Sequence, residues 1–319
     1  MAGEKVLVTG GAGFIGSHLV DGLLAKGYKV RVLDNFTTGK KRNLSNVLSD
    51  IELITGDIRD EEVIKQAVLG VDFVLHQAAL GSVPRSIDDP LTTHECNSTG
   101  TLKLLLAARD AGVQRLVYAS SSSVYGNTPT LPKIETMPPS PRSPYALSKL
   151  SGEVYCQLFS SLYGFETVSL RYFNVFGPRQ DEHSQYAAVI PKFVTALLKG
   201  EPITIFGDGQ QTRDFTYIEN VVLANLLAMT APKETAGIAL NIACSGYYSI
   251  LSVGEKLADI LNVPLKINFA KVRPGDVQDS YADINKAKEL INYFPKIDFQ
   301  TGLKQTAEWF QEQYLELVK

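Results

Sequence analysis

Three glycines at three-residue spacing near the N-terminus most constrain what this chain of 319 residues can fold into. They stand in the segment Val8-Thr9-Gly10-Gly11-Ala12-Gly13-Phe14-Ile15-Gly16, between a β-rich run and a helical pattern. In such a unit Gly10 permits a tight turn, Gly13 lets the backbone approach a pyrophosphate, and Gly16 packs helix against strand. The helix N-terminus adds unpaired N–H donors that favour an anion. The glycines predict a phosphate-binding turn, although a merely tight turn has the same spacing.

The rest of the first half alternates β-rich runs with helical patterns, which is typical of a parallel sheet covered by helices on both faces. The expected strands are Lys5–Val8, Val30–Leu33, Ile51–Ile54, Phe73–Leu75, Leu116–Ala119 and Thr167–Leu170, and the expected helices are Ser17–Lys26, Glu61–Leu69, Ser98–Ala111 and Tyr145–Tyr163. We therefore predict an α/β fold with a Rossmann-type, doubly wound parallel sheet in residues 1–174. Residues 175–319 are expected to form a smaller C-terminal substrate-binding lobe and can return a short part of the sheet.

An acidic residue extends the glycine pattern to a dinucleotide site. Asp34 ends the second expected strand 18 residues after Gly16. This is close to the spacing, about 20 residues, of an acid that binds the adenosine ribose. Its carboxylate would accept hydrogen bonds from a free ribose diol and repel the 2′-phosphate of NADP, so NAD is the predicted cofactor. Asp57 follows the third strand and is placed for the adenine. An ordinary loop carboxylate is the alternative for Asp57.

Tyr145 and Lys149 stand four residues apart after Pro144, which suits the start of a helix, and therefore share one helix face. A phenol has a pKa of about 10 in water, and a neighbouring ammonium would favour the phenolate and supply a base near neutral pH. Ser121 ends another expected strand, where parallel-sheet proteins bind ligands, and could hydrogen-bond the same substrate hydroxyl. The alternative is that tyrosine and lysine share a face by chance.

With the glycine turn, the serine and the Tyr-xxx-Lys pair in this order, the sequence resembles the extended short-chain dehydrogenase/reductase family over nearly its whole length. The resemblance implies a catalytic triad of Ser121, Tyr145 and Lys149. It also implies a set of NAD-binding residues: Gly10, Gly13, Phe14, Ile15, Gly16, Asp34, Asn35, Asp57, Ile58, Ala78, Asn97, Tyr145, Lys149 and Tyr172. Asn97 would be a structural support, and Tyr172 would lie beside the nicotinamide. The alternative is a catalytically inactive scaffold that binds the dinucleotide.

Ser123, two residues before Tyr125, narrows the reaction. In the resemblance, enzymes that dehydrate or decarboxylate nucleotide sugars usually carry an acid there, and elimination of water needs one. Without it, reversible oxidation at C4 is the economical reaction: Tyr145 takes the hydroxyl proton, NAD takes the hydride, and the rotated keto sugar receives it on the other face. The chain thus resembles UDP-sugar 4-epimerases, which are isomerases. A UDP-glucuronate 4-epimerase, a nucleotide-sugar dehydratase and a non-catalytic NAD-binding regulator are the alternatives.

Two segments, Leu80–Ser86 and Tyr186–Lys192, look most like those of bacterial UDP-N-acetylhexosamine 4-epimerases, whereas Asp181–Gln185 departs from that group. The resemblance implies a substrate site made of Gly81, Ser82, Ser121, Ser122, Tyr145, Asn174, Ala188, Val189, Phe206, Arg213, Arg273, Asp276 and Ser280. Arginine suits a pyrophosphate because its planar guanidinium makes bidentate, charge-assisted hydrogen bonds. The small residues at 81, 188 and 280 leave room for an N-acetyl group. UDP-GlcNAc and UDP-GalNAc are therefore the predicted pair, with UDP-Glc and UDP-Gal as possible further substrates.

Composition argues against several other classes of protein. The formal net charge of −3 gives no basic excess for binding nucleic acid. The three cysteines and four histidines show no metal-ligand spacing, so we expect reduced thiols and no metal. The sequence has no signal peptide and no apolar run of about 20 residues, which predicts a cytoplasmic protein without a membrane span. Residues 98–111 and 145–163 resemble the helices that pair in the family's homodimer, although packing within one subunit would give the same pattern.

Overall fold

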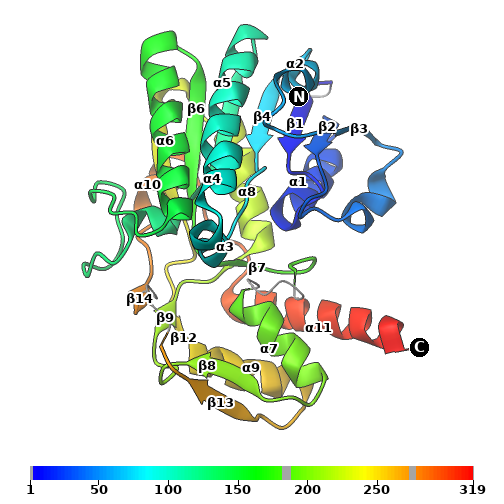
Figure 1. Ribbon diagram of the computed structural model, residues 1–319, viewed down its shortest axis with the longest axis vertical. Helices are drawn as coiled ribbons and strands as arrows, with labels where there is room; N and C mark the ends of the chain where they lie inside the picture. The colour runs from blue at the N-terminus through cyan, green and yellow to red at the C-terminus, as the bar shows by residue number, and fades with distance from the viewer. Residues whose placement is uncertain (1–2, 182–187, 273–277, 319) are drawn as a thin grey trace.

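Seven parallel strands form the central sheet of the computed structural model, which describes residues 3–181, 188–272 and 278–318 (Figure 1). Across the sheet the strands are β11 (Ile238–Ile242), β6 (Glu166–Tyr172), β5 (Arg115–Ser121), β4 (Phe73–His76), β1 (Lys5–Thr9), β2 (Lys29–Asp34) and β3 (Ile51–Thr55). The order moves outward from β1 in both directions, which is the doubly wound arrangement. The predicted Rossmann-type α/β fold is confirmed.

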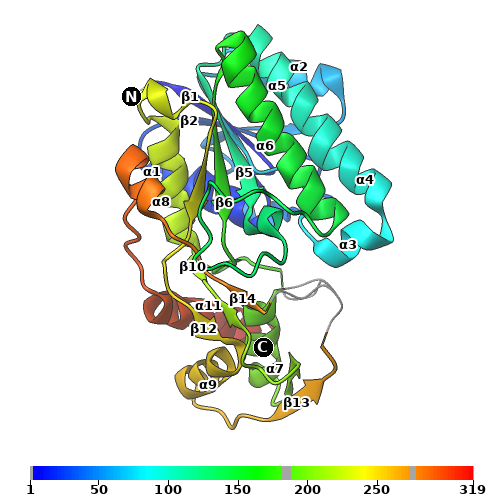
Figure 2. The same cartoon turned by 90° about the vertical axis from the view of Figure 1, so that its left-hand side faces the viewer.

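Helices cover both faces of the sheet, as Figure 2 shows. One face carries α1 (Phe14–Ala25) and α8 (Ile218–Met229), and the other carries α2 (Glu61–Val68), α5 (Gly100–Asp110) and α6 (Pro144–Tyr163). Side chains of β1 alternate between the two layers, Val6 and Val8 toward the first and Leu7 toward the second, and all three are fully buried. Because both faces are covered, the strands are apolar along most of their length.

Helix α6, which carries Tyr145 and Lys149, has well-defined ends. Ser143 caps its start by accepting the N–H of Ala146 at 3.1 Å. Gly164 ends it in the left-handed conformation, with φ of +66°. The two short helices α3 (Val83–Asp88) and α4 (Pro90–His94) pack beside α6. These contacts fix the first turns of α6 against the end of β5, where the expected catalytic residues lie.

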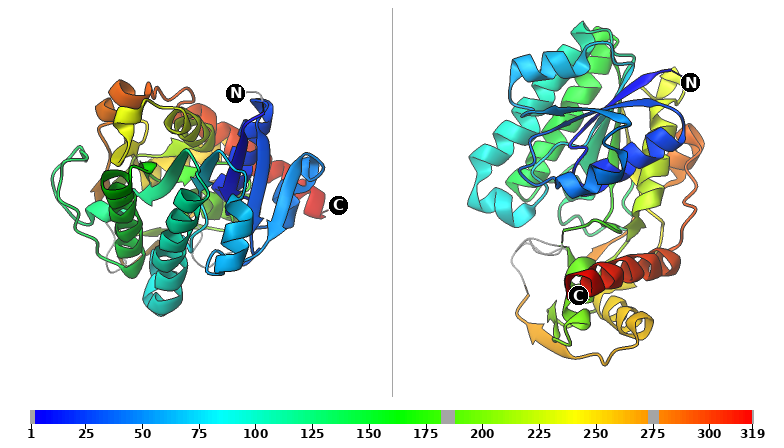
Figure 3. Two further views of the ribbon diagram at one scale, coloured as in Figure 1. Left: turned by 90° about the horizontal axis from the view of Figure 1, so that it is seen from above. Right: turned by 90° about the vertical axis from the view of Figure 1, so that its right-hand side faces the viewer.

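A second lobe lies below the sheet in Figure 1 and in the right-hand view of Figure 3. It contains α7 (Val189–Leu198), α9 (Ile250–Leu261) and α11 (Phe299–Val318), the strand pair β8 (Ile203–Phe206) and β13 (Ile267–Ala270), and the small sheet of β12 (Tyr248–Ser249), β9 (Thr212–Arg213) and β14 (Asp279–Ser280). The pair β7 (Val175–Phe176) and β10 (Thr216–Tyr217) joins the two parts, and α10 (Asn285–Ile291) packs near β11. The division of the chain at residue 174 stays a prediction. Two elements from after residue 174, α8 and β11, belong to the sheet layer. None of the described helices is long and apolar enough to span a membrane.

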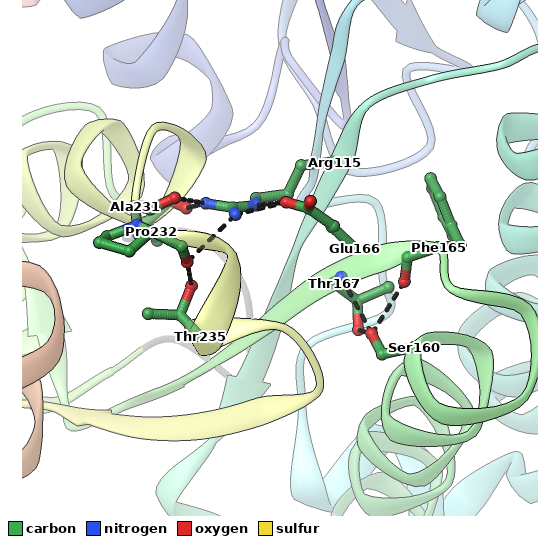
Figure 4. A network of polar contacts seen from close by, with 9 residues as sticks. Arg115, Ser160, Phe165, Glu166, Thr167, Ala231, Pro232 and Thr235 are labelled. Atoms are coloured by element: carbon green, nitrogen blue, oxygen red, sulfur yellow. Dashed lines mark hydrogen bonds and ion pairs between the residues drawn. The ribbon is translucent and has the colours of Figure 1, made fainter.

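Arg115, at the amino end of β5, links the sheet to the C-terminal end of α8 (Figure 4). Its guanidinium donates to the Glu166 carboxylate on β6 and to backbone oxygens in and just after the last turn of α8. Ser160 and Thr167 form a further, partly buried pair there, with 2.9 Å between Oγ and Oγ1. A cation at a helix C-terminus is favourable because it meets the negative end of the helix dipole. Structural contacts therefore occupy the amino ends of β5 and β6. The cavity of the candidate active site lies at the carboxyl ends of the strands.

Candidate active site

The glycine turn between β1 and α1 brings separate pieces of backbone into close contact. Gly10 has a φ of +68°, and a Cβ there would lie 2.8 Å from the backbone of Ala78. A Cβ on Gly16 would clash with the carbonyl oxygen of Gly10. Gly13 is the N-cap of α1 and leaves the first N–H groups of that helix without a side-chain cap. The turn can therefore accept the close approach of a pyrophosphate.

A cavity of about 440 Å³ runs past this turn along the carboxyl ends of the strands. Most of the residues expected to bind the cofactor line it: Gly10, Gly13, Phe14, Ile15, Gly16, Asp34, Asn35, Asp57, Ile58, Ala78, Tyr145, Lys149 and Tyr172. Cavities of roughly 300–1,000 Å³ are typical of small-molecule sites. The structure thus gathers, around one cavity, residues that the sequence separates by most of its first half.

Asp34 ends β2 beside the turn, and backbone donors hold its carboxylate from two sides. It accepts the N–H of Ala12 at 2.9 Å and the N–H of Phe36 at 2.8 Å. Burial raises the pKa of Asp34, and these two hydrogen bonds oppose the rise. The carboxylate also lines the cavity, so it is placed to accept hydrogen bonds from a ribose diol and to repel a 2′-phosphate.

Asn35 and Asp57 form a polar wall at the same end of the cavity. The Asn35 amide donates to Asp57 at 2.8 Å, and the Arg59 guanidinium donates to both carboxylate oxygens at 2.8 and 2.9 Å. The Arg59 guanidinium holds the pKa of Asp57 well below its usual range. Asp57 is therefore ionised at neutral pH, and its expected contact with the adenine stays a prediction.

The expected triad comes together from two elements. Tyr145 and Lys149 line the cavity from the first turns of α6, and Ser121 ends β5, which packs against α6. The Lys149 ammonium donates to the carbonyl oxygen of Ala119 at 2.7 Å. A substrate hydroxyl between Ser121 and Tyr145 would thus meet a hydroxyl donor and a phenol in one place.

Burial moves the pKa values of Tyr145 and Lys149 in opposite directions. It raises the pKa of the Tyr145 phenol, with the Ser121 hydroxyl opposing the rise. It lowers the pKa of Lys149 to about 8. The net effect on Tyr145 is a rise and not the fall expected from a neighbouring ammonium, because removing a phenolate from water is costly.

Asn97 lies behind the cavity in a single π-helical turn, Glu95–Thr99, which continues into α5. Its side-chain oxygen accepts the N–H of Leu80 at 2.8 Å, and its amide donates to the Leu80 carbonyl and to the Ser148 hydroxyl. Isolated π turns are frequent near functional sites because they re-aim a side chain. Asn97 joins the loop after β4 to α6, a position that suits a structural support.

A second cavity of about 250 Å³ lies in the other lobe and adjoins the first, since Gln180 and Ala188 line both. The expected substrate residues that line the second cavity are Asn174, Ala188, Val189, Phe206 and Arg213, and those that line the first are Gly81, Ser82, Tyr145 and Ala188. Asn174 has a φ of +31° and donates from its amide to the carbonyl oxygen of Asp214 at 2.9 Å. The two cavities therefore adjoin, and Tyr145 lines the first of them.

The remaining expected substrate residues lie beside these cavities or outside the described residues. Ser122 begins the 3₁₀ turn Ser122–Tyr125 that follows β5. Ser280, on β14, pairs with Arg213 of β9 and so lies next to the second cavity without lining it. Arg273 and Asp276 lie outside the described residues, so their expected roles stay predictions.

Residues 6–243 match the NAD dependent epimerase/dehydratase family. The chain belongs to this family. It is therefore an NAD-dependent enzyme, as the glycine turn, Asp34 and the Tyr145–Lys149 pair predicted. NAD fits the larger cavity on structural grounds as well, because the glycine turn leaves room for a pyrophosphate and Asp34 stands at the ribose end.

Three solved structures of family members are similar to the whole chain. The UDP-N-acetylglucosamine 4-epimerase of Methanobrevibacter ruminantium M1, in complex with UDP-N-acetylmuramic acid, is 40% identical with a TM-score of 0.94 and covers 98% of this chain and 100% of its own. The UDP-glucose 4-epimerase of Thermotoga maritima, with UDP-glucose, is 37% identical with a TM-score of 0.93 and coverage of 97% and 99%. The UDP-glucuronic acid 4-epimerase of Bacillus cereus, with UDP-glucuronic acid and NAD, is 34% identical with a TM-score of 0.90 and coverage of 97% and 100%.

Two residues that line the cavities, Cys96 and Gln211, were not predicted from the sequence. Cys96 lines the first cavity and lies near enough to Lys149 to affect its titration. Gln211 lines the second cavity and donates to the Phe206 carbonyl oxygen at 2.6 Å. Gln211 could have been found from its spacing, because it stands two residues before Arg213 and residues at i and i+2 of an extended segment face the same way. No group of three or more His, Cys, Asp or Glu residues in the described segments could hold a metal ion.

Proposed function

We propose that the protein is a UDP-sugar 4-epimerase that interconverts UDP-GlcNAc and UDP-GalNAc. The observation that carries the proposal is the junction of the two cavities: Gln180 and Ala188 line both, while Tyr145 lines the first cavity and Arg213 lines the second. A sugar held by its nucleotide in the second cavity would have its reacting carbon near Tyr145. The solved structures with UDP-sugars support this arrangement, because their chains are similar from end to end.

NAD, when bound, accepts the hydride from C4 of the sugar and returns it. Tyr145 is placed to take the proton of the C4 hydroxyl and to give it back after the keto sugar has turned over. Ser121 donates a hydrogen bond to the same oxygen or to the phenolate, and the Lys149 ammonium favours the phenolate through its charge. Proton and hydride both return to the sugar, so no external reductant is consumed.

The carboxylates of the site favour epimerisation over dehydration. Among the described residues, Asp34, Asp57 and Asp181 are the carboxylates that line the two cavities. Asp34 and Asp57 lie at the adenosine end, and Asp181 is ion-paired with Lys40 at 2.7 Å. Elimination of water from the sugar needs an acid or base near C5 and C6, and the position of Ser123 offers a hydroxyl. Reversible oxidation at C4 needs only the Tyr145 proton.

The choice of an N-acetylated sugar rests on the space around Gly81 and Ala188. A Cβ at Gly81 would meet no heavy atom within 4 Å, so the cavity is open on that side. Ala188 presents only a methyl group where the two cavities join. An acetamido group on C2 therefore has room in both poses of the rotated sugar. The UDP-N-acetylglucosamine 4-epimerase of M. ruminantium supports this choice.

UDP-glucuronate is the second candidate substrate. Arg85, on α3, lines the cavity with Ser82 and Thr92. A guanidinium there could pair with the C6 carboxylate of a uronic acid, which a hexose lacks. The B. cereus enzyme, named for UDP-glucuronic acid, is 34% identical to this chain.

The test is a side-by-side assay of UDP-GlcNAc, UDP-Glc and UDP-glucuronate by NMR, with NAD and no reductant. We expect UDP-GlcNAc and UDP-GalNAc to reach the same mixture from either side. Tyr145→Phe should lower kcat by about 10²–10⁴-fold and still bind NAD, because the proton carrier is lost while the ring remains. Turnover of UDP-glucuronate alone would favour the second candidate, a keto-deoxy product would indicate a dehydratase, and NAD binding without turnover of any sugar would refute an enzymatic role.

We further propose that two copies pair through α5 and α6, which lie side by side in Figures 1 and 3. The outer face of these helices and of the neighbouring α3 and α4 exposes apolar side chains: Ile87, Leu91, Leu106, Leu147, Val154, Leu158 and Leu162. On α6 four of them recur at spacings of four and seven residues and form one stripe. Apolar surface of this extent marks an interaction face. The cytoplasmic location expected from the sequence stays a prediction.

A further inference from the structure

Asp214 is a fully buried residue behind one wall of the second cavity. Gln211, Arg213 and Phe215 line that cavity from alternate positions of the segment that contains β9. Successive side chains of an extended segment point to opposite sides, so the Asp214 carboxylate faces away from the cavity. Asp214 lines neither of the two cavities. Its side chain is therefore placed to support the wall from behind.

The polar groups of Asp214 bind several other parts of the chain. Its N–H donates to the Ser280 carbonyl oxygen at 2.7 Å, and its carbonyl oxygen accepts the Asn174 amide at 2.9 Å. Its two carboxylate oxygens accept separate backbone N–H groups, Oδ1 from Cys244 at 3.1 Å and Oδ2 from Ala282 at 3.3 Å. These partners lie just after β6, just after β11, and in and after β14. Asp214 thus joins the cavity wall to three other segments.

A carboxylate suits this place because both of its oxygens accept. The asparagine side chain has one acceptor oxygen, and its NH₂ group would face an N–H donor here. Burial raises the pKa of Asp214 to about 7, and the N–H groups of Cys244 and Ala282 oppose the rise. Asp214 is therefore mostly ionised at pH 8, where both oxygens can accept a hydrogen bond.

These contacts set the position of two residues that face the second cavity. β9 and β14 lie between the sheet and the helices of the second lobe (Figure 1). The Arg213 guanidinium donates to the carbonyl oxygens of Thr212 at 2.8 Å and Gln278 at 3.1 Å, so its place follows the pairing of these strands. Asn174 lines the same cavity, and the Asp214 carbonyl holds its amide.

We propose that Asp214 is a positioning residue for the nucleotide diphosphate, which holds Arg213 and Asn174 at the spacing that UDP requires. The inference rests on the proposed UDP-sugar function and deepens it, since it concerns how the nucleotide is held. A residue that only stabilised the second lobe would change the free energy of unfolding. A positioning residue also changes the affinity of the folded protein for UDP.

The test is calorimetric titration of the NAD-loaded protein with UDP at pH 8, in wild type and Asp214→Asn. The variant keeps the size of the side chain and removes one acceptor. We expect the Kd for UDP to rise by about 10–100-fold, because a displaced guanidinium loses charge-assisted hydrogen bonds to phosphate. The affinity for NADH should stay within about twofold. Equal Kd values for UDP in wild type and Asp214→Asn would overturn the proposal.

Asn220→Ala is the matched control. Asn220 is also buried, and its side-chain oxygen accepts two backbone N–H groups of a distant segment, from Lys296 at 2.8 Å and Ile297 at 3.1 Å. It lies on α8 and lines neither cavity. This variant should unfold at lower urea concentration and keep the wild-type affinity for UDP. An equal loss of UDP affinity in Asn220→Ala would indicate a general loosening of the lobe and overturn the proposal.

Hydrogen exchange in the wild type tests the same coupling without a substitution at residue 214, should Asp214→Asn not fold. Coupling between two sites is reciprocal, so bound UDP should strengthen the hydrogen bonds that the carboxylate accepts. We expect saturating UDP to slow exchange of the Cys244 and Ala282 amides by about tenfold or more, measured by NMR. The Lys296 and Ile297 amides, which Asn220 binds, should change less. Unchanged exchange at Cys244 and Ala282 would overturn the proposal.

The outcomes separate this inference from the proposed function. Wild-type protein that binds no UDP would refute the nucleotide site on which both rest. Weaker UDP binding in Asp214→Asn, with a wild type that turns over no UDP-sugar, would refute the function and keep the role of Asp214. In an active enzyme, Asp214→Asn should raise KM for UDP-GlcNAc by about tenfold or more and leave kcat within about threefold, because Asp214 lies outside the cavity of Tyr145. A lower kcat with unchanged KM would overturn the inference alone.

Discussion

Tyr145 and Lys149 are buried together, and their pKa values shift in opposite directions for the same physical reason. Loss of water disfavours each charged form, so the pKa of the phenol rises and that of the ammonium falls to about 8. The phenolate is then available near neutral pH only if other groups favour it. Ser121, whose hydroxyl opposes the rise, and a protonated Lys149, one helical turn from Tyr145, are the candidates for this role.

The titration of Lys149 predicts an alkaline limit to activity. Above about pH 8 the ammonium loses its proton, so the charge that favours the phenolate disappears and kcat should fall. Lys149→Arg keeps a charge at all accessible pH values, because guanidinium has a pKa above about 12. We expect this variant to have a lower kcat but no decline near pH 8. A kcat profile from pH 6 to 10 checks this, and an unchanged alkaline limb in Lys149→Arg would exclude Lys149 as its source.

Asp34 should set the choice between NAD and NADP. Asp34→Ser keeps a short acceptor for the N–H groups of Ala12 and Phe36 but removes the negative charge beside the ribose. We expect NADH to bind about 10–100-fold more weakly, since charged hydrogen bonds contribute about 1.5–3 kcal/mol. NADPH should bind less weakly relative to NADH than in wild type. Fluorescence titration with both cofactors measures this ratio, and an unchanged ratio would mean that Asp34 does not face the ribose.

Motifs predicted the residues whose chemistry depends on spacing along the chain. The glycines, Asp34 and the Tyr145–Lys149 pair each lie within one element or one turn, so their geometry follows from local periodicity. The contacts of Ser123 and the place of Cys96 depend on how the 3₁₀ turn and the π turn fold back, which no periodicity reports. The direction of the Tyr145 pKa was missed for a similar reason, because burial is a property of the folded chain.

At the scale of elements, His76 joins β4 to two neighbours beneath the cavity. Its Nδ1 lies 2.7 Å from the Thr9 hydroxyl on β1, and its Nε2 lies 2.9 Å from the Thr101 hydroxyl on α5. The Thr101 proton is donated to the Asn97 carbonyl at 2.6 Å, so Nε2–H must be the donor to Thr101. The Thr9 hydroxyl then donates to Nδ1. His76 is thus fixed as one neutral tautomer, and protonation would remove its acceptor.

This arrangement predicts acid sensitivity. Burial lowers the pKa of His76 to about 3, below the value of about 6.5 in the unfolded chain. The unfolded state therefore binds one more proton between these values, and the stability that His76 confers is lost as pH falls through this window, by about 1.4 kcal/mol per unit. His76→Asn should reduce the slope of unfolding free energy against pH between 6 and 4.5. Urea unfolding at several pH values measures it.

His94→Asn, at an exposed position, is the control for this series. A smaller slope should remain in His76→Asn, because burial also lowers the pKa of His18 to about 4. An unchanged slope in His76→Asn would contradict the tautomer assignment and the neutral state of the ring.

The sequence pattern predicted long elements better than short ones. The strand expected at Lys5–Val8 extends to Thr9, and the helix expected from Ser17 begins at Phe14, because Gly13 can cap it without a side chain. β11 has the apolar character of a sheet strand but is separated from β6 by elements of the second lobe and by α8, so nothing nearby in sequence reveals its pairing with β6. Two-residue strands such as β9 and β14 exist only through their partners, and no local pattern could predict them.

At the scale of the whole molecule, side-chain contacts join the sheet layer to the segment that leads into the second lobe. Arg179 pairs with Asp21 of α1 at 2.7 Å, and the Pro178 carbonyl lies 3.0 Å from the His18 ring. Lys40, in the loop after β2, pairs with Asp181 at 2.7 Å. Asp181 also lines the cavity, so these contacts hold the second lobe against the cofactor end of the first.

The apolar stripe on α6 predicts where two copies of the chain pair. Leu158 is 41% exposed and Leu162 67% exposed, and both lie on the outer face beside α5. If two copies pair there, a carboxylate at residue 158 would be buried without a partner in the dimer but hydrated in the monomer. A penalty of about 3 kcal/mol corresponds to roughly 150-fold in Kd. Leu158→Glu should therefore be monomeric at concentrations where wild type is dimeric, with folding and NAD binding retained. Leu315→Glu, at a 54% exposed site on α11 of the other lobe, should remain dimeric. Sedimentation equilibrium distinguishes these cases: a monomeric wild type, or a dimeric Leu158→Glu, would place any assembly elsewhere on the surface.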